Sequence, residues 1–188
     1  MFDAQCDLAA MVYERDQDPD EVLRDFASDL NARGYRAVGL VQTGHHCLDA
    51  RKLSAMLVHN GEELQLFQNL GAGATGCRLD VGQLLGAGAR VAGAIEEGAD
   101  LVIVNRFGRQ ECEGKGLSFL VERALSADIP VVIAVPSHRF GDWIKFAGGM
   151  SVKLRCDRKA LDAWWAAVSA RTAGAVRRDH QTVCEAFK

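Results

Sequence analysis

The 188-residue chain has little of what marks membrane, secreted or fibrous proteins. Proline occurs only three times, no apolar run approaches the roughly 18 residues of a membrane span, and the net charge at pH 7 is −3. The first residues carry Asp3 and Asp7 where a secretion signal carries positive charge. We therefore expect a cytoplasmic protein with no membrane partner, folded as a single domain over residues 1–188.

The six cysteines lack the spacing of a local metal or redox motif. They stand at positions 6, 47, 77, 112, 156 and 184, so the chain contains no C-x-x-C pair. In a reducing compartment, cysteines spaced this way are most simply free thiols.

Positive charge gathers toward the C-terminus, where residues 151–188 hold 8 basic and 4 acidic side chains. No nucleic-acid-binding motif accompanies this charge, so we interpret it as the solvated face of a helix and expect no nucleic-acid partner.

The sequence alternates between strand-like and helix-like segments. Short apolar runs, typical of strands buried on both faces, occupy residues 8–13, 35–42, 99–105 and 130–136. Helical patterns cover residues 20–33, 80–97, 117–127, 137–146 and 158–173, the last within a C-terminal helical extension at about 151–188. This alternation predicts an α/β domain of three layers with a mainly parallel sheet.

A β-hairpin insertion is predicted at about residues 50–68. Two short strand-like runs flank Asn60-Gly61, a dipeptide that favours a two-residue hairpin turn because both positions tolerate positive φ.

Helical spacing also predicts part of the core. The residues expected to pack inside are Leu84, Leu85, Val91 and Ile95 on the helix at 80–97, Leu161 and Val168 on the helix at 158–173, and the three tryptophans Trp143, Trp164 and Trp165.

The loop after the first strand, residues 14–21, lacks the parts of a phosphate-binding P-loop. It has no glycine and no lysine, and it holds five carboxylates against one arginine. Such a loop repels a triphosphate, so a nucleotide is a less favoured ligand than a small anion. We interpret the loop as an acidic helix start.

The glycine-rich stretch before the helix at 80–97 is a candidate anion site. Gly71, Gly73 and Gly76 permit close backbone approach, and Arg78 complements a tetrahedral oxyanion near a helix start. The alternative, that the glycines only allow a tight connection, has equal weight on spacing alone.

The loop after residues 99–105 concentrates functional groups where ligands bind in open parallel sheets. Its candidate ligand-binding residues are Asn105, Arg106, Arg109 and Lys115. Glu111 and Glu113 are the weak candidates for a catalytic base or metal ligand.

His45, His46 and Cys47 are weak metal-ligand candidates, and the predicted hairpin could bring His59 near them. Consecutive side chains diverge, so a surface loop is the favoured interpretation. Cys77 beside Arg78 has surroundings that lower a thiol pKa, but no base accompanies it.

The stretches NLGAGATGCRLD (69–80), ADLVIVNRFGRQECEGKGL (99–117) and IPVVIAVP (129–136), with GLVQ and FAGG, resemble an uncharacterised bacterial family. Members of that family are encoded near molybdate-transport genes and are similar in layout to small P-loop nucleoside-triphosphatases. The resemblance implies a P-loop-NTPase-like fold and a role in molybdenum or related oxyanion handling. The chain departs from active P-loop enzymes because it lacks Walker A, and Asn105-Arg106 replaces the Walker B acids.

Three functions remain open from sequence. The leading hypothesis is a protein that binds a molybdate- or tungstate-like oxyanion on a degenerate P-loop-NTPase-like fold, for molybdenum or tungsten homeostasis. The alternatives are an atypical nucleoside-triphosphatase or phosphotransferase, and a thiol or metal-trafficking protein using Cys47, Cys77 or Cys112. A homo-oligomer is compatible with all three.

Overall fold

The computed structural model describes residues 6–43, 54–66 and 79–170. The elements are β1 (Leu8–Tyr13), α1 (Pro19–Ala32), β2 (Ala37–Thr43), β3 (Ser54–Leu57), β4 (Glu63–Gln65), α2 (Val81–Glu96), β5 (Leu101–Val104), α3 (Arg109–Cys112), α4 (Ser118–Ser126), β6 (Val131–Pro136), the 3₁₀ turn η1 (Ser137–Arg139), α5 (Phe140–Phe146) and β7 (Val152–Arg155). The described chain then continues as a helix over residues 158–170.

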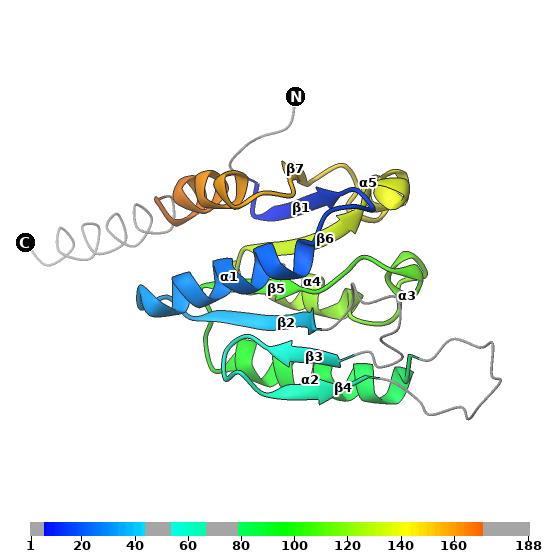
Figure 1. Ribbon diagram of the computed structural model, residues 1–188, viewed down its shortest axis with the longest axis horizontal. Helices are drawn as coiled ribbons and strands as arrows, with labels where there is room; N and C mark the ends of the chain where they lie inside the picture. Colours follow the sequence, from blue (N-terminus) through cyan, green and yellow to red (C-terminus); the bar gives the residue numbers. More distant parts are fainter. Residues whose placement is uncertain (1–5, 44–53, 67–78, 171–188) are drawn as a thin grey trace, which may run out of the picture.

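Seven strands form one sheet in the order β4-β3-β2-β5-β6-β1-β7 (Figure 1). The five neighbouring strands β2, β5, β6, β1 and β7 pair in parallel. In contrast, β3 pairs antiparallel with both β2 and β4. The hairpin therefore widens one edge of a parallel sheet. This arrangement confirms the predicted mainly parallel α/β fold with a hairpin insertion.

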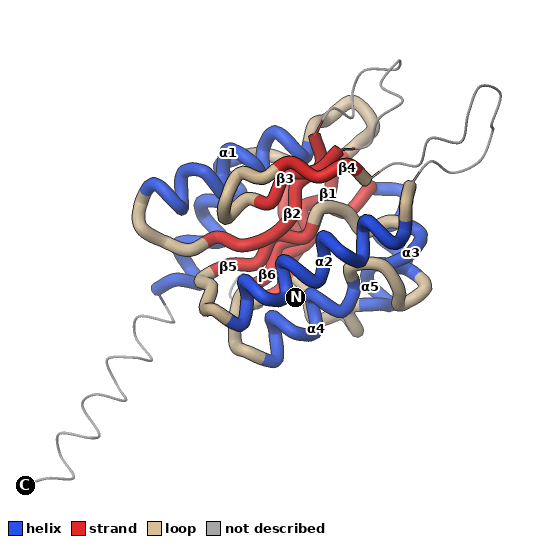
Figure 2. Tube along the Cα trace, turned by 90° about the horizontal axis from the view of Figure 1, so that it is seen from below, coloured by secondary structure: helices blue, strands red, loops and turns tan. Residues whose placement is uncertain are grey.

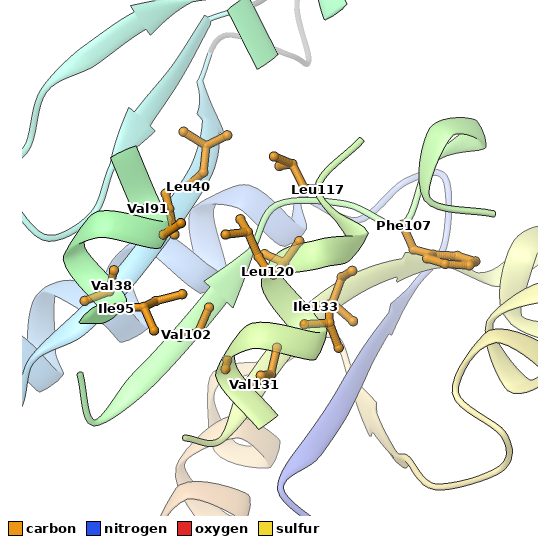
Figure 3. Packing of buried hydrophobic residues seen from close by; sticks show 14 of the residues in the cluster. Val38, Leu40, Val91, Ile95, Val102, Phe107, Leu117, Leu120, Val131 and Ile133 are labelled. Carbon is orange, nitrogen blue, oxygen red and sulfur yellow. The ribbon is translucent and has the colours of Figure 1, made fainter. Parts of the chain in front are cut away.

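Helices cover both faces of the sheet (Figure 2). On one face, α1 and the helix at 158–170 bury a cluster that includes Phe26, Trp164 and Trp165. On the other face, α2, α4 and α5 pack over a second cluster, part of which is seen in Figure 3. Apolar side chains on both sides of the strands thus produce the three layers that the continuous apolar runs predict.

The predicted core is confirmed with one exception. Leu84, Val91 and Ile95 of α2 are buried, but Leu85 is 45% exposed. One residue along an α-helix turns the side chain by about 100°, so Leu85 cannot share the face of Leu84. All three tryptophans are buried, as are Leu161 and Val168.

The predicted two-residue turn of the hairpin is wrong. Leu57 donates its N–H to the carbonyl of Glu62, which leaves four residues in the connection. Gly61 has a φ of +74°, but Asn60 does not adopt positive φ. Instead, the Asn60 Oδ1 accepts the N–H of Glu62 at 3.0 Å, so the asparagine stabilises the loop through its side chain.

A seventh strand, β7, lies in the segment that we expected to be helical from about residue 151. Only four residues long, β7 alternates buried Val152 and Leu154 with exposed Lys153 and Arg155. Its pairing with β1 is the tertiary contact that makes this short run a strand. The predicted helix at 158–173 is confirmed over residues 158–170.

None of the helices among the described residues is long and apolar enough to cross a membrane.

Candidate functional site at the carboxyl edge of the sheet

The strand order places a topological switch point beside the carboxyl end of β1. From β1 the chain turns to α1 on one face of the sheet, and from the neighbouring β6 it turns to α5 on the other face. Ligands of open α/β sheets bind where two connections diverge in this way. The residues that follow β1, β6 and β5 therefore form the candidate site.

The first turn of α1 is already satisfied by a carboxylate of the same chain. Asp18 Oδ1 accepts the backbone N–H groups of Asp20 at 2.9 Å and Glu21 at 3.2 Å. A helix start can bind an anion because its free N–H groups and dipole favour negative charge. Here a side chain supplies that charge, as the acidic sequence of residues 14–21 predicts, and an external phosphate would have to displace it.

Asp20 reaches across to Arg106 at the end of β5. The distance from Arg106 Nη2 to Asp20 Oδ2 is 2.6 Å, and the two side chains are only 17% and 6% exposed. The Arg106 guanidinium also lies over the Tyr13 ring, 5.5 Å from its centroid. Arg106, predicted to contact a ligand, thus holds a carboxylate of its own chain in this structure.

Two acidic protons beside this pair are held more tightly than usual. Burial raises the pKa of Tyr13; Arg106 opposes this effect and Asp20 reinforces it. Burial also raises the pKa of the Cys156 thiol to about 11, reinforced by the carboxylates of Asp18, Asp157 and Asp20. Cys156 is therefore a neutral thiol at pH 7 and a poor nucleophile.

A hydrogen bond joins the first loop to the residue that follows β6. The Ser137 hydroxyl donates to Glu14 Oε2 at 2.6 Å. This contact ties together the two connections that leave the sheet in opposite directions, so it narrows the place where a ligand of this fold usually lies.

Asn105 joins the ends of β5 and β2. Its buried Oδ1 accepts the N–H of Gln42 at 2.9 Å, and its Nδ2 donates to Gln42 Oε1 at 3.4 Å. These bonds fix the carboxyl end of the strand pair and give Asn105 a positioning role.

Glu111 organises the loop that follows β5. This glutamate is 6% exposed, its Oε2 accepts the N–H of Gly108, and its Oε1 accepts the N–H of Leu117, both at 2.9 Å. A base or metal ligand at this position would have to give up bonds that hold the backbone. The arrangement favours a structural role for Glu111.

Glu113 lies between two exposed cations of the same loop. Its carboxylate accepts hydrogen bonds from Arg109 Nε and Lys115 Nζ, each at 3.2 Å. The side chains of these two cations are 82% and 67% exposed. The hydrogen bonds from Lys115 and then Arg109 lower the pKa of Glu113. Glu111, the other carboxylate of this loop, is buried, so the loop presents two cations and one carboxylate to solvent.

Several candidates lie outside the described residues: Gly71, Gly73, Gly76, Arg78, His45, His46, Cys47 and Cys77. Within residues 6–43, 54–66 and 79–170, no group of three or more His, Cys, Asp or Glu side chains could hold a metal ion. Cys112 is described, and its Sγ accepts from Arg139 Nη1 at 3.6 Å.

Sequence reasoning missed the role of Asp20. It lies three residues before Leu23 and six before Phe26, which puts a carboxylate on the buried side of an amphipathic helix. A charged residue on that side requires a partner, so the pattern could have shown that Asp20 pairs with a cation, although not with which one.

Residues 8–164 match a family described as proteins of unknown function, DUF2478. The chain belongs to this family. It is also 39% identical over 180 residues to a Bradyrhizobium diazoefficiens protein named molybdenum import ATP-binding protein ModC 2. That match covers 94% of this chain but 20% of the relative, so the chain spans about a fifth of the relative's length.

Among solved structures, the crystal structure of THEP1 from the hyperthermophile Aquifex aeolicus is similar with a TM-score of 0.57. The match covers 84% of this chain and 95% of THEP1 at 11% sequence identity, which shows that the two proteins share a fold and shows nothing about activity.

Proposed function

We propose that this domain binds a tetrahedral oxyanion of the molybdate or tungstate class in the cytoplasm and takes part in molybdenum or tungsten homeostasis. The observation that carries the proposal is the separation of charge at the carboxyl edge. Asp18 caps α1, whereas the exposed cations Arg109 and Lys115 lie on the loop after β5. The name of the ModC 2 relative suggests the oxyanion.

In this proposal, anion recognition has moved from the first loop to the neighbouring loops. Gly71, Gly73, Gly76 and Arg78 would provide contacts from the segment before α2, and Arg109 and Lys115 would provide charge from the loop after β5. Asn105 and Arg106 hold the strand ends and α1 in place. Charge-assisted hydrogen bonds from such groups suit a tetrahedral oxyanion.

The direct test is titration calorimetry of the full chain with molybdate, tungstate, sulfate and phosphate. We expect saturable heat with molybdate and tungstate. Replacing both exposed cations, Arg109→Gln with Lys115→Gln, should weaken binding about tenfold, which corresponds to about 1.4 kcal/mol. Absence of heat with all four anions from a folded sample would overturn the proposal.

Arg90→Gln with Arg123→Gln is the matched control. Arg90 pairs with Glu62 and Arg123 of α4 pairs with Glu96, so this variant removes two positive charges, as the test variant does, without touching the carboxyl-edge loops. Equal weakening by this variant would mean that net charge, and not the loop after β5, attracts the anion.

Nucleotide hydrolysis is the competing outcome. With Mg-ATP we expect no phosphate release, because α1 offers its first N–H groups to Asp18. Phosphate release that survives further purification and is lost in Glu113→Gln would replace the binding proposal with the enzymatic one.

A further inference from the structure

Arg139 is a partly buried arginine at the carboxyl edge of the sheet, and it has no carboxylate partner among the described residues. Its guanidinium makes one hydrogen bond there, from Nη1 to the Cys112 sulfur at 3.6 Å, and no ion pair. A thiol sulfur is only a weak acceptor. The positive charge is therefore held in place but is not neutralised by the side chain that it contacts.

The other partly buried arginines differ from Arg139 in this respect. Within the described ranges, each of them forms an ion pair with an aspartate or a glutamate: Arg24, Arg36, Arg106 and Arg158. Removing a guanidinium from water costs free energy unless an anion compensates its charge. The unpaired guanidinium of Arg139 thus indicates a position that an external anion can occupy.

One edge of this guanidinium is accessible to a ligand. Nη1 contacts Cys112, which leaves the Nε and Nη2 hydrogens of the other edge unused in the part of the chain that the structure describes. Neither of these nitrogens is a fully buried donor, so both retain contact with solvent. Two parallel N–H groups of a guanidinium match two oxygens of an oxyanion, which permits a bidentate contact.

The fold places Arg139 beside the residues of the proposed anion site. Arg139 ends η1, directly after β6, and α5, which begins at the next residue, packs beside α3 (Figure 2). Cys112 lies three residues after Arg109 in α3, so these two side chains share one side of that helix. The contact between Arg139 and Cys112 therefore brings a second guanidinium to the side of α3 that carries Arg109.

Arg139 also acts on the end of β1. Burial raises the pKa of the Tyr13 phenol, and Arg139 is one of the cations that oppose this effect. Tyr13 is the last residue of β1, at the switch point of the sheet. The charge of Arg139 thus lies near the place where ligands of open α/β sheets bind, whereas the neighbouring charge of Arg106 is already balanced by Asp20.

We propose that Arg139 anchors a tetrahedral oxyanion through its Nε and Nη2 hydrogens, with Arg109 beside it as a more exposed second cation. The inference rests on the proposed function and adds to it a binding residue that follows β6. Bidentate contacts are geometrically specific, so Arg139 would orient the anion. Arg109 and Lys115, which are more exposed, would mainly attract it.

Titration calorimetry of the full chain with molybdate tests the role of Arg139. We expect Arg139→Gln to weaken binding about tenfold, as the loss of hydrogen bonds to a charged group predicts. Arg139→Lys keeps the charge but not the planar fork, so its affinity should fall between those of wild type and Arg139→Gln. Wild-type affinity in Arg139→Gln overturns the assignment, and wild-type affinity in Arg139→Lys overturns the bidentate contact.

The matched control is Arg123→Gln, which also removes one positive charge but lies on α4, where Arg123 pairs with Glu96. This variant should leave the affinity for molybdate unchanged. If it weakens binding as much as Arg139→Gln does, the anion senses only net charge and the assignment of Arg139 is wrong.

Cys112 reports on the same position without any change of sequence. Its thiol lies beside Arg139, so an oxyanion bound there should slow alkylation of Cys112 by iodoacetamide severalfold, relative to sodium chloride at the same ionic strength. Cys6 is also partly buried but precedes β1, at the opposite edge of the sheet, and should react at an unchanged rate. Mass spectrometry of the two peptides measures both rates. Absence of protection by molybdate, tungstate and phosphate, or equal protection of Cys6, overturns the Arg139 site.

The two measurements separate this inference from the proposed function. Calorimetric heat with molybdate, together with an unprotected Cys112 and full affinity in Arg139→Gln, overturns this inference and leaves the proposed function in place. Protection of Cys112 by phosphate alone, without heat from molybdate or tungstate, supports the Arg139 site and overturns the molybdate and tungstate assignment.

Discussion

Asp20 and Arg106 connect the first turn of α1 to the carboxyl end of β5 through a largely buried ion pair, with 2.6 Å between Oδ2 and Nη2. The pair holds a helix on one face of the sheet to a strand whose own crossover runs to the other face. It lies at the carboxyl edge of the sheet, so the stability of the domain and the position of its first loop depend on the same contact.

Asp20→Ala should therefore lower the free energy of unfolding by about 3 kcal/mol, because it leaves the Arg106 charge buried without this partner. The double change Asp20→Leu with Arg106→Met should recover part of that loss, since both charges are then absent. Urea unfolding measures both effects. A loss no larger than that of Arg123→Gln, which removes an exposed ion pair, would show that the buried pair contributes little.

The cap of α1 allows a finer test. Asp18→Ala removes the acceptor for two backbone N–H groups and should cost about 1 kcal/mol, whereas Asp18→Ser keeps a capping oxygen and should cost a few tenths. Thermal unfolding of the two variants gives the comparison. Equal losses would mean that the charge of Asp18, and not its hydrogen bonds, stabilises the helix start.

Glu111 and Gly116 test the structural interpretation of the loop after β5. Gly116 has a φ of +60°, and a Cβ there would lie 2.2 Å from Glu111 Oε1, the oxygen that accepts the Leu117 N–H. Gly114 has a similar φ of +68°, but no atom lies within 4 Å of a Cβ at that position. The two glycines share the backbone strain and differ in their contact with Glu111.

Gly114→Ala should cost about 1 kcal/mol for the left-handed backbone alone. Gly116→Ala should cost at least about 2 kcal/mol more, because the carboxylate must move and release a buried N–H. Chemical unfolding separates the two. If both variants lose the same stability, Glu111 does not hold this loop. Glu111 would then again be a candidate for a catalytic base or metal ligand.

The strands and helices with long apolar patterns could be predicted from the sequence. Residues 8–13 were predicted as a strand and form β1 with the same bounds, because six consecutive apolar residues leave no exposed face. β7 could not be predicted in this way, since Val152–Arg155 is short and its strand conformation depends on pairing with β1. Local pattern is a weak guide where a partner strand decides the conformation.

The sequence predicted the location of the candidate site but not the contacts within it. The order of strands and helices indicated which loops meet at the carboxyl edge, and the acidic first loop was correctly interpreted as a helix start. The partner of each charge could not be derived, because Asp20 and Arg106 are 86 residues apart and their contact is set by the order of β1, β6 and β5. The hydrogen bond between Glu14 and Ser137 could not be predicted for the same reason, since these residues are 123 positions apart.

Cys156 gives the domain a defined response to alkaline pH. Its pKa is raised from 9.0 to about 11, chiefly by burial and further by Asp18, Asp157 and Asp20. The unfolded thiol loses its proton near pH 9 and the folded thiol only near pH 11. The stabilising contribution of the protonated thiol is therefore complete below pH 9 and is lost as the pH rises from 9 to 11.

Cys156→Ser should accordingly flatten the fall in unfolding free energy between pH 9 and 11, because a serine hydroxyl does not titrate there. The difference between wild type and variant isolates Cys156 from every other group that loses a proton at alkaline pH. In the wild type, alkylation at position 156 should remain slow at pH 8 and accelerate toward pH 11, as followed by mass spectrometry of the peptide. Identical pH slopes, or rapid alkylation at pH 8, would show that the carboxylates and burial around this thiol do not hold its proton.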